Sequence, residues 1–200
     1  MKLFQIKALP NVLRSLPSLR LNVTVQNPRL IHNLALVGFM GTGKSSVGRL
    51  AADLLRFDFI DTDEWIESQT GKSIAEIFEQ NGEAAFRLLE EDTARALSSR
   101  RNIVISAGGG FVANPDNLAS LKSHALVICL WASPETIWER VRTQSHRPLL
   151  QTADPPGKIR ELLEQRSAAY HQADAMIHTG FRSPKEVAQQ VLHQFRLARK

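Results

Sequence analysis

The chain has 200 residues, of which 43% are hydrophobic, and a formal net charge of +5 at pH 7. This length favours one domain with a real core, and no apolar run approaches the roughly 18 residues of a membrane span. The single cysteine, Cys129, lies in an apolar run and predicts a buried strand residue, not a disulfide partner or nucleophile. Because aromatic content is only 6% and no RNA-binding signature is visible, we expect no nucleic acid partner.

The first 33 residues differ in composition from the rest. They carry five basic residues and three prolines, and the first acidic residue of the chain is Asp53. Such a stretch has some transit-peptide character but no secretory pattern, and a poorly ordered extension or a misplaced start codon explains it more simply. We therefore expect a cytoplasmic protein, with a plastid location as the alternative if residues 1–33 act as a transit segment.

From Leu34 onward, strand-like and helix-like segments alternate, which predicts a parallel sheet with helices on both faces. The predicted strands are Leu34–Val37, Phe57–Ile60, Ile103–Ser106, Ala125–Leu130 and Ala175–His178. The predicted helices are Lys44–Leu55, Asp63–Thr70, Ser73–Asn81, Gly82–Ser99, Asn114–Lys122, Ser133–Thr143, Pro156–His171 and Ser183–Arg199. Residues 34–200 are thus predicted to form a single domain.

Two segments interrupt this alternation. The segment 62–98 is mostly helical and is longer than the connection between the second and third predicted strands needs to be. This predicts an inserted substrate-binding subdomain. Residues 143–157 are polar and rich in proline, which suits a lid over bound phosphates. An ordinary surface loop is the alternative for this second segment.

The segment Gly38–Ser45 fits the phosphate-binding pattern G-x-x-x-x-G-K-[ST] at every required position. It lies between a predicted strand and a predicted helix, which is the order that the chemistry needs. Backbone N–H groups of such a loop surround phosphate oxygens, and the helix start adds partial positive charge. Lys44 would reach the terminal phosphates and the Ser45 hydroxyl would bind Mg²⁺. A tight strand-to-helix turn is the alternative interpretation.

Two polar motifs follow the second and third predicted strands, at the sheet edge where ligands bind. One of Asp61 and Asp63 could hold Mg²⁺ through water, and the other could orient an alcohol for attack. The alternative interpretation is that they are a helix cap and a surface acid. The run Gly108-Gly109-Gly110 allows close backbone approach to a ligand, or else forms a flexible turn.

Arginines on three separate segments, Arg87, Arg147 and Arg166, could converge on a carboxylate and the transferred phosphate. Each of them, taken alone, also fits a solvated surface charge.

The order and spacing of these motifs resemble the shikimate kinase family over about residues 34–195. The motifs that carry the resemblance are Gly38–Ser45, Asp61–Asp63, Gly71–Phe78, Gly82–Arg87, Glu90-Glu91, Gly108–Gly110 and Arg147–Leu150. The resemblance implies the α/β, P-loop, NMP-kinase-like three-layer fold, with a five-stranded parallel sheet in the order 2-3-1-4-5. It also implies that the γ-phosphate of MgATP is transferred to the 3-hydroxyl of shikimate by a monomeric enzyme.

The resemblance further implies roles for individual residues. Lys44, Asp63 and Arg147 are expected to be catalytic, and Ser45 and Asp61 to hold Mg²⁺. The residues expected at ATP are Gly41, Thr42, Gly43, Lys44, Ser45, Ser46, Arg140, Arg147 and Arg182. Those expected at shikimate are Asp63, Phe78, Phe86, Arg87, Gly108, Gly109, Gly110 and Arg166, although the two phenylalanines also fit core positions.

Three other functions stay open on the sequence. A sugar-acid kinase of the gluconate type would share the phosphate loop and an anionic polyol acceptor. A non-catalytic, ligand-binding relative would keep the fold without turnover. RNA binding through the basic start of the chain has only charge to support it.

Overall fold

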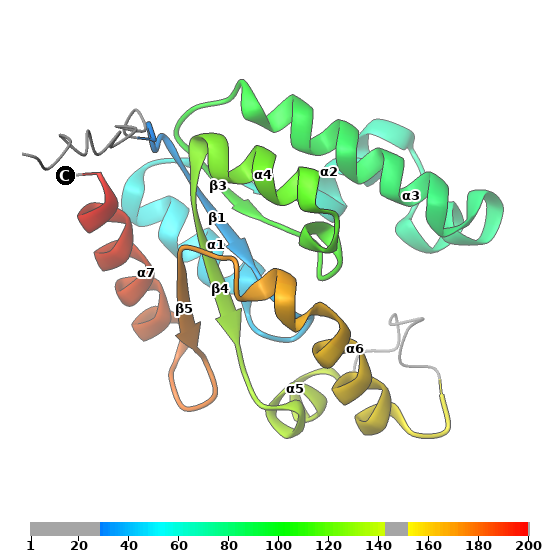
Figure 1. The fold of residues 1–200 in the computed structure, drawn as a ribbon. Helices are drawn as coiled ribbons and strands as arrows, with labels where there is room; N and C mark the ends of the chain where they lie inside the picture. Colours follow the sequence, from blue (N-terminus) through cyan, green and yellow to red (C-terminus); the bar gives the residue numbers. More distant parts are fainter. Residues whose placement is uncertain (1–28, 143–151, 200) are drawn as a thin grey trace, which may run out of the picture.

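The computed structural model describes residues 29–142 and 152–199, and the structural statements below concern those residues. A five-stranded sheet runs through the centre of the protein, with all its strands parallel and in the order β2-β3-β1-β4-β5 (Figure 1). The strands are β1 (Asn33–Val37), β2 (Asp58–Asp61), β3 (Ile103–Ser106), β4 (Ala125–Trp131) and β5 (Ala175–His178). The parallel sheet covered by helices is the one that the sequence predicted, and the strand order is the one that the family resemblance implied.

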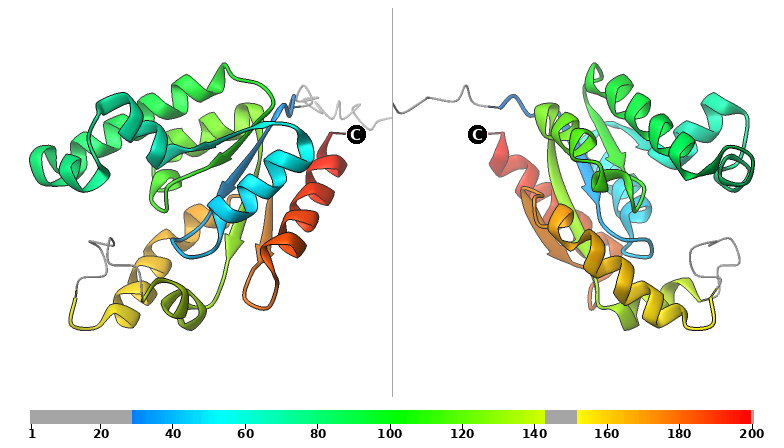
Figure 2. Two further views of the ribbon diagram at one scale, coloured as in Figure 1. Left: turned by 180° about the vertical axis from the view of Figure 1, so that it is seen from behind. Right: turned by 45° about the vertical axis from the view of Figure 1, so that its right-hand side comes forward.

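Helices cover both faces of the sheet. They are α1 (Lys44–Leu55), α2 (Thr62–Thr70), α3 (Ile74–Ser98), α4 (Pro115–His124), α5 (Pro134–Val141), α6 (Pro155–Tyr170) and α7 (Pro184–Ala198), with a 3₁₀ turn, η1 (Phe111–Ala113). Seen from behind, α1 and α7 lie side by side over one face, while α3, α4 and α6 lie over the other (Figure 2). The arrangement is therefore three-layered.

Strand β1 shows why the layers form. Its side chains are almost fully buried on both faces, as expected of a central parallel strand. Leu34 and Leu36 belong to the core formed with α1 and α7, whereas Ala35 and Val37 belong to the core formed with α3, α4, α5 and α6. Alternation along one strand thus supplies two separate hydrophobic cores.

Most helices begin where the local sequence predicts. Ser133 and Ser183 cap α5 and α7 with their side chains, and a proline follows each of them. Gly82 (φ 78°) interrupts α3 and separates the two helices that the sequence predicted there. Pro155 and the next two residues form the first turn of α6 rather than a loop, because Asp154 caps that turn through the N–H of Gly157. The other predicted lid residues, 143–151, lie outside the described part of the chain.

Small differences from the prediction have local causes. Strand β2 begins at Asp58 instead of Phe57, because Arg56 (φ 57°) ends α1 and the N–H of Phe57 still bonds to the Ala52 carbonyl. The turn η1 was not predicted, since three residues carry no periodicity. Cys129 is buried in β4, as predicted, and burial raises the pKa of its thiol to about 11.

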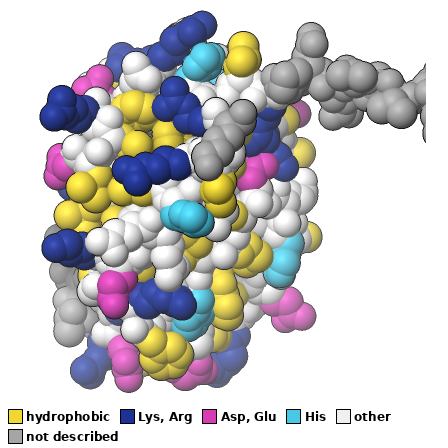
Figure 3. All heavy atoms as spheres, turned by 90° about the vertical axis from the view of Figure 1, so that its left-hand side faces the viewer, with side chains coloured by type: hydrophobic (Ala, Val, Ile, Leu, Met, Phe, Trp, Pro, Cys, Tyr) yellow, Lys and Arg dark blue, Asp and Glu magenta, His cyan; other side chains and the backbone are white. Residues whose placement is uncertain are grey.

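The described surface mixes residue types. Figure 3 faces the side that is at the left of Figure 1, and there hydrophobic side chains lie among charged side chains of both signs. Exposed large hydrophobic residues of the protein include Leu54, Trp131 and Leu197. In the part of the chain that the structure describes, no helix combines the length and apolar character that a membrane crossing requires.

Candidate active site

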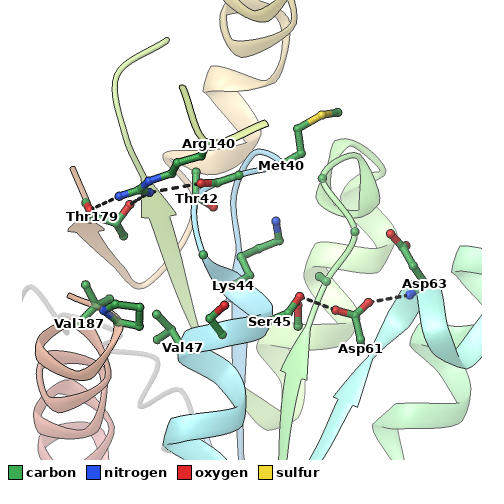
Figure 4. A pocket seen from close by; sticks show the side chains of 18 of the residues that line it. Met40, Thr42, Lys44, Ser45, Val47, Asp61, Asp63, Arg140, Thr179 and Val187 are labelled. Atoms are coloured by element: carbon green, nitrogen blue, oxygen red, sulfur yellow. Dashed lines mark hydrogen bonds between the residues drawn. The ribbon is translucent and has the colours of Figure 1, made fainter. Parts of the chain in front are cut away.

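A cavity of about 620 Å³ opens at the carboxyl ends of β1, β2 and β3 (Figure 4). Three separate motifs meet there: the phosphate loop between β1 and α1, the two aspartates after β2, and the glycines after β3. The sequence-predicted residues that line it are Gly41, Thr42, Gly43, Lys44, Ser45, Ser46, Asp61, Asp63, Gly108, Gly109, Arg140 and Arg182. This is the sheet edge where ligands of open α/β folds bind.

The phosphate loop leaves the start of α1 open to a ligand. Gly43 adopts a left-handed conformation (φ 93°), and no side chain among the described residues caps α1. The first N–H groups of that helix are therefore available to an anion, as they are at other helix N-termini that bind phosphate. The Lys44 ammonium lies 3.0 Å from the Phe39 carbonyl oxygen, which holds it over the loop. The Thr42 hydroxyl donates to the same oxygen at 2.7 Å.

Asp61 joins the phosphate loop to α2. Its Oδ2 accepts a hydrogen bond from the Ser45 hydroxyl at 2.8 Å, while its Oδ1 caps α2 by accepting from the N–H of Asp63 at 3.1 Å. The Ser106 hydroxyl lies 3.3 Å from that of Ser45. Three oxygen-bearing side chains therefore gather beside the loop. Oxygen donors of this kind suit a hard divalent cation that keeps several of its waters.

The second aspartate lies against the glycine loop. A Cβ atom added at Gly108 would lie 2.6 Å from Oδ1 of Asp63 and 3.5 Å from Oε1 of Glu90. Glu90 is only 1% exposed, and its Oε1 has no hydrogen-bond partner among the described residues. Burial raises the pKa of Glu90, and the nearby charge of Asp63 adds to that effect against the opposing influence of Arg87. Two carboxyl groups therefore share this wall of the site.

Two of the predicted arginines lie at the remaining glycines. Arg87 is held on α3 by Glu83 at 2.6 Å and Glu90 at 2.7 Å, and a Cβ at Gly110 would lie 2.8 Å from its Nη1. From α6, Arg166 donates to the Gly109 carbonyl at 3.1 Å. Each glycine of the run thus abuts a polar side chain from a different element: Asp63 of α2, Arg166 of α6 and Arg87 of α3.

The opposite end of the cavity is formed by α5 and the segment after β5. Arg140 donates to the Gly41 carbonyl at 3.2 Å and to the Thr179 carbonyl at 2.7 Å, so it connects the phosphate loop to that segment (Figure 4). Arg182 donates to the His178 carbonyl and lines the same end, together with Pro184.

Phe78 and Phe86 do not line the cavity, and neither do Arg87, Gly110 and Arg166. Phe78 and Phe86 contact each other with ring centroids 4.8 Å apart and planes tilted by 42°, and they pack with Ile66 and Ile77 in a small core between α2 and α3. Arg147 lies outside the described residues.

Sequence reasoning assigned no site role to several polar residues, among them Ser106, Glu90, Tyr170 and Thr179. Glu90 and Tyr170 lie on helices at positions i+3 and i+4 from Arg87 and Arg166, and that spacing was the signal that could have paired them. Thr179 follows a strand end without any motif around it, so its role as a partner of Arg140 needed the structure.

Comparison with known proteins identifies the family. The family model for shikimate kinase matches residues 40–196. A shikimate kinase of Thermodesulfovibrio yellowstonii is 44% identical over 82% of this chain and 94% of its own length. A shikimate kinase of Thermus thermophilus is 42% identical over 84% of this chain and 91% of its own.

Solved structures agree with the sequence relatives. A shikimate kinase from Acinetobacter baumannii, solved in complex with shikimate, superposes with a TM-score of 0.80 and 38% identity, covering 86% of this chain and 96% of that one. A gluconokinase from Sinorhizobium meliloti superposes with a TM-score of 0.56 at 16% identity, which shows a common fold alone. Because the family model and the relatives each cover most of the sequence, this chain belongs to the shikimate kinase family.

Proposed function

We propose that this protein transfers the γ-phosphate of ATP to the 3-hydroxyl of shikimate, releasing ADP and shikimate 3-phosphate. The observation that carries the proposal is the convergence around the glycine run. Asp63, Gly108 and Gly109 line the phosphate-loop cavity, and the guanidinium groups of Arg166 and Arg87 lie next to Gly109 and Gly110. A hydroxylated ring with a carboxylate needs both kinds of group.

The phosphate loop binds the nucleotide. The N–H groups at the start of α1 and the Lys44 ammonium surround the phosphates and offset the charge that spreads over the transferred group. Ser46 lines the same wall, and Arg140 and Arg182 flank the base at the far end of the cavity. Arg147 would add a further positive charge over the phosphates, as the resemblance implies.

The acceptor is oriented by Asp63. A carboxylate there accepts a hydrogen bond from the attacking hydroxyl and directs its oxygen at the phosphorus atom. Arg87 and Arg166 bind the carboxylate of shikimate, and paired charge-assisted hydrogen bonds of this kind fix its orientation. The Arg87 guanidinium lies 5.5 Å from the centre of the Phe86 ring, and Phe86 in turn packs against Phe78.

Mg²⁺ is the cofactor that the donor set fits. The Ser45 hydroxyl would bind it directly and Asp61 through water, since both oxygens lie beside the phosphate loop and 2.8 Å apart. When bound, the ion would neutralise phosphate charge and fix the geometry of the triphosphate.

We also propose that the protein is a monomer, as the resemblance to the family implies. A cytoplasmic location and a single functional domain beginning near residue 34 remain predictions, as does the plastid alternative for residues 1–33. Residue 34 is close to the start of β1, at Asn33, where the described core begins.

The proposal is tested by measuring ADP release with MgATP, with shikimate and with gluconate as acceptors. We expect release that depends on shikimate and is abolished in Asp63→Asn, which should still bind ATP. Asp58→Asn is the matched control, because that residue is exposed at the opposite end of β2. Release with gluconate alone would favour a sugar-acid kinase, and ATP binding without release would favour a non-catalytic relative.

A further inference from the structure

The Gly109 carbonyl oxygen receives two hydrogen bonds from one helix. The Tyr170 hydroxyl donates to it at 2.6 Å and the Arg166 guanidinium at 3.1 Å. These residues are four apart on α6, so they project from the same side of the helix. Tyr170 is 6% exposed, and its side chain packs into the larger hydrophobic core.

Gly109 lies where three parts of the site meet. A Cβ added there would lie 3.4 Å from the Met40 amide nitrogen of the phosphate loop and 3.6 Å from Nη1 of Arg166. Gly109 therefore lies beside both the phosphate loop and the Arg166 guanidinium.

The acceptor and Gly109 share the Arg166 guanidinium, which gives one of its five N–H groups to the Gly109 carbonyl. If the guanidinium turns to pair with the acceptor's carboxylate, that N–H is withdrawn from Gly109. A partly buried carbonyl that loses a donor without replacement costs free energy, which would oppose binding. A second donor that stays in place removes that cost.

We infer that Tyr170 is a positioning residue for the acceptor. Its hydroxyl holds the Gly109 carbonyl, which lets Arg166 turn its N–H groups to the acceptor's carboxylate without leaving that carbonyl unsatisfied. The inference rests on the proposed function in one respect, that Arg166 binds the carboxylate. Burial raises the pKa of Tyr170 to about 12, so the phenol keeps the proton that it donates throughout the working range of pH.

The first test is Tyr170→Phe, which removes the hydroxyl and keeps the ring. The loss of one buried hydrogen bond predicts a rise of about tenfold in the KM for shikimate. The KM for ATP and kcat should change by less than about twofold, because nothing at Lys44 or Asp63 is altered. The matched control is Ser120→Ala, which removes a hydroxyl that donates to the Ala94 carbonyl between α4 and α3, away from Gly109. An unchanged KM for shikimate, or an equal rise in both KM values, would overturn the inference.

A second test needs no substitution, because Tyr170 is the single tyrosine of the chain. Protein labelled with ¹³C at the tyrosine ζ carbon gives one NMR resonance that reports the hydrogen bond of the hydroxyl. We expect saturating shikimate to shift that resonance and ATP alone to leave it in place. A resonance that shikimate does not move would contradict the inference even if the phenylalanine variant failed to fold.

The two proposals fail in different ways. Absence of shikimate-dependent ADP release from the parent protein would remove the proposed function itself. Normal release from the parent, with an unchanged KM in Tyr170→Phe, would remove only the role of Tyr170.

Discussion

Replacing Gly108 with alanine should separate catalysis from folding. The added Cβ would lie 2.6 Å from Oδ1 of Asp63, whereas ordinary van der Waals contact begins at 3.4 Å. The carboxylate must therefore move away by about 0.8 Å. Asp63 can do so by rotating its own side chain, so the backbone and the core are spared and stability should change little.

The expected loss follows from that displacement. Misplacing a reacting group by about 1 Å can lower a rate by roughly 100-fold, which corresponds to about 2.7 kcal/mol of activation free energy. We expect kcat of Gly108→Ala to fall by about that factor. The affinity for ATP should not change, because the new methyl group lies on the acceptor side of the cavity.

The assay is steady-state ADP release with both substrates varied, together with calorimetric titration of ATP and a thermal melt. Gly110→Ala is the matched comparison, since the same substitution two residues away meets Nη1 of Arg87 at 2.8 Å instead of Asp63. It should raise the KM for shikimate more than it lowers kcat. A Gly108→Ala enzyme that is stable and has a normal kcat would refute the placement of Asp63 at the reacting hydroxyl.

Two further predictions concern other regions. Arg140→Ala should raise the KM for ATP by at least about tenfold and leave the KM for shikimate unchanged, because it removes charge-assisted hydrogen bonds to Gly41 and Thr179. Initial rates with each substrate varied would test this. Equal changes in both KM values would contradict it. Burial, with a smaller effect from nearby His32, lowers the pKa of His124. The pKa of His124 in the unfolded chain has its ordinary value of about 6.5, so at lower pH the unfolded chain binds more protons than the folded one. The free energy of unfolding should therefore fall as the pH is lowered from about 7 to about 5. Urea denaturation should show a smaller fall in His124→Gln, and identical pH profiles would count against this cause.

Much of the fold was predictable because its signals are local. A buried parallel strand such as β4 is a continuous apolar run, and a helix such as α7 begins at a serine, a proline and an acidic residue. Each of these patterns is readable within a few residues. The strand order came from the family resemblance instead, since local patterns do not say which strands pair.

The site was predictable only where chemistry and spacing form a motif. The phosphate loop meets that condition, and so do the aspartates that follow β2. Glu90 belongs to the Glu90-Glu91 motif of the resemblance but had no assigned role, and only the packing of α3 shows that it is buried near Asp63. Tyr170 lies in no motif of the sequence, and its ring packs in the hydrophobic core. Only the structure shows where its hydroxyl points.

Asn33 stands at the amino-terminal end of β1, the opposite end of the sheet from the cavity. Its side-chain oxygen accepts from the N–H of Ile103 on β3, and its nitrogen donates to the Arg100 carbonyl and contacts Nδ1 of His124. One amide thus pins β1 against β3, and a slip in their pairing would break these bonds.

That pinning reaches the far end of the strands. Strand β1 runs into the loop proposed to bind the donor, and β3 runs into the glycines proposed to border the acceptor. Asn33 therefore helps to set the distance between donor and acceptor, although it contacts neither of them. Substitutions at Asn33 should change the geometry of phosphate transfer. A search for variants with altered activity should therefore include this remote end of the sheet.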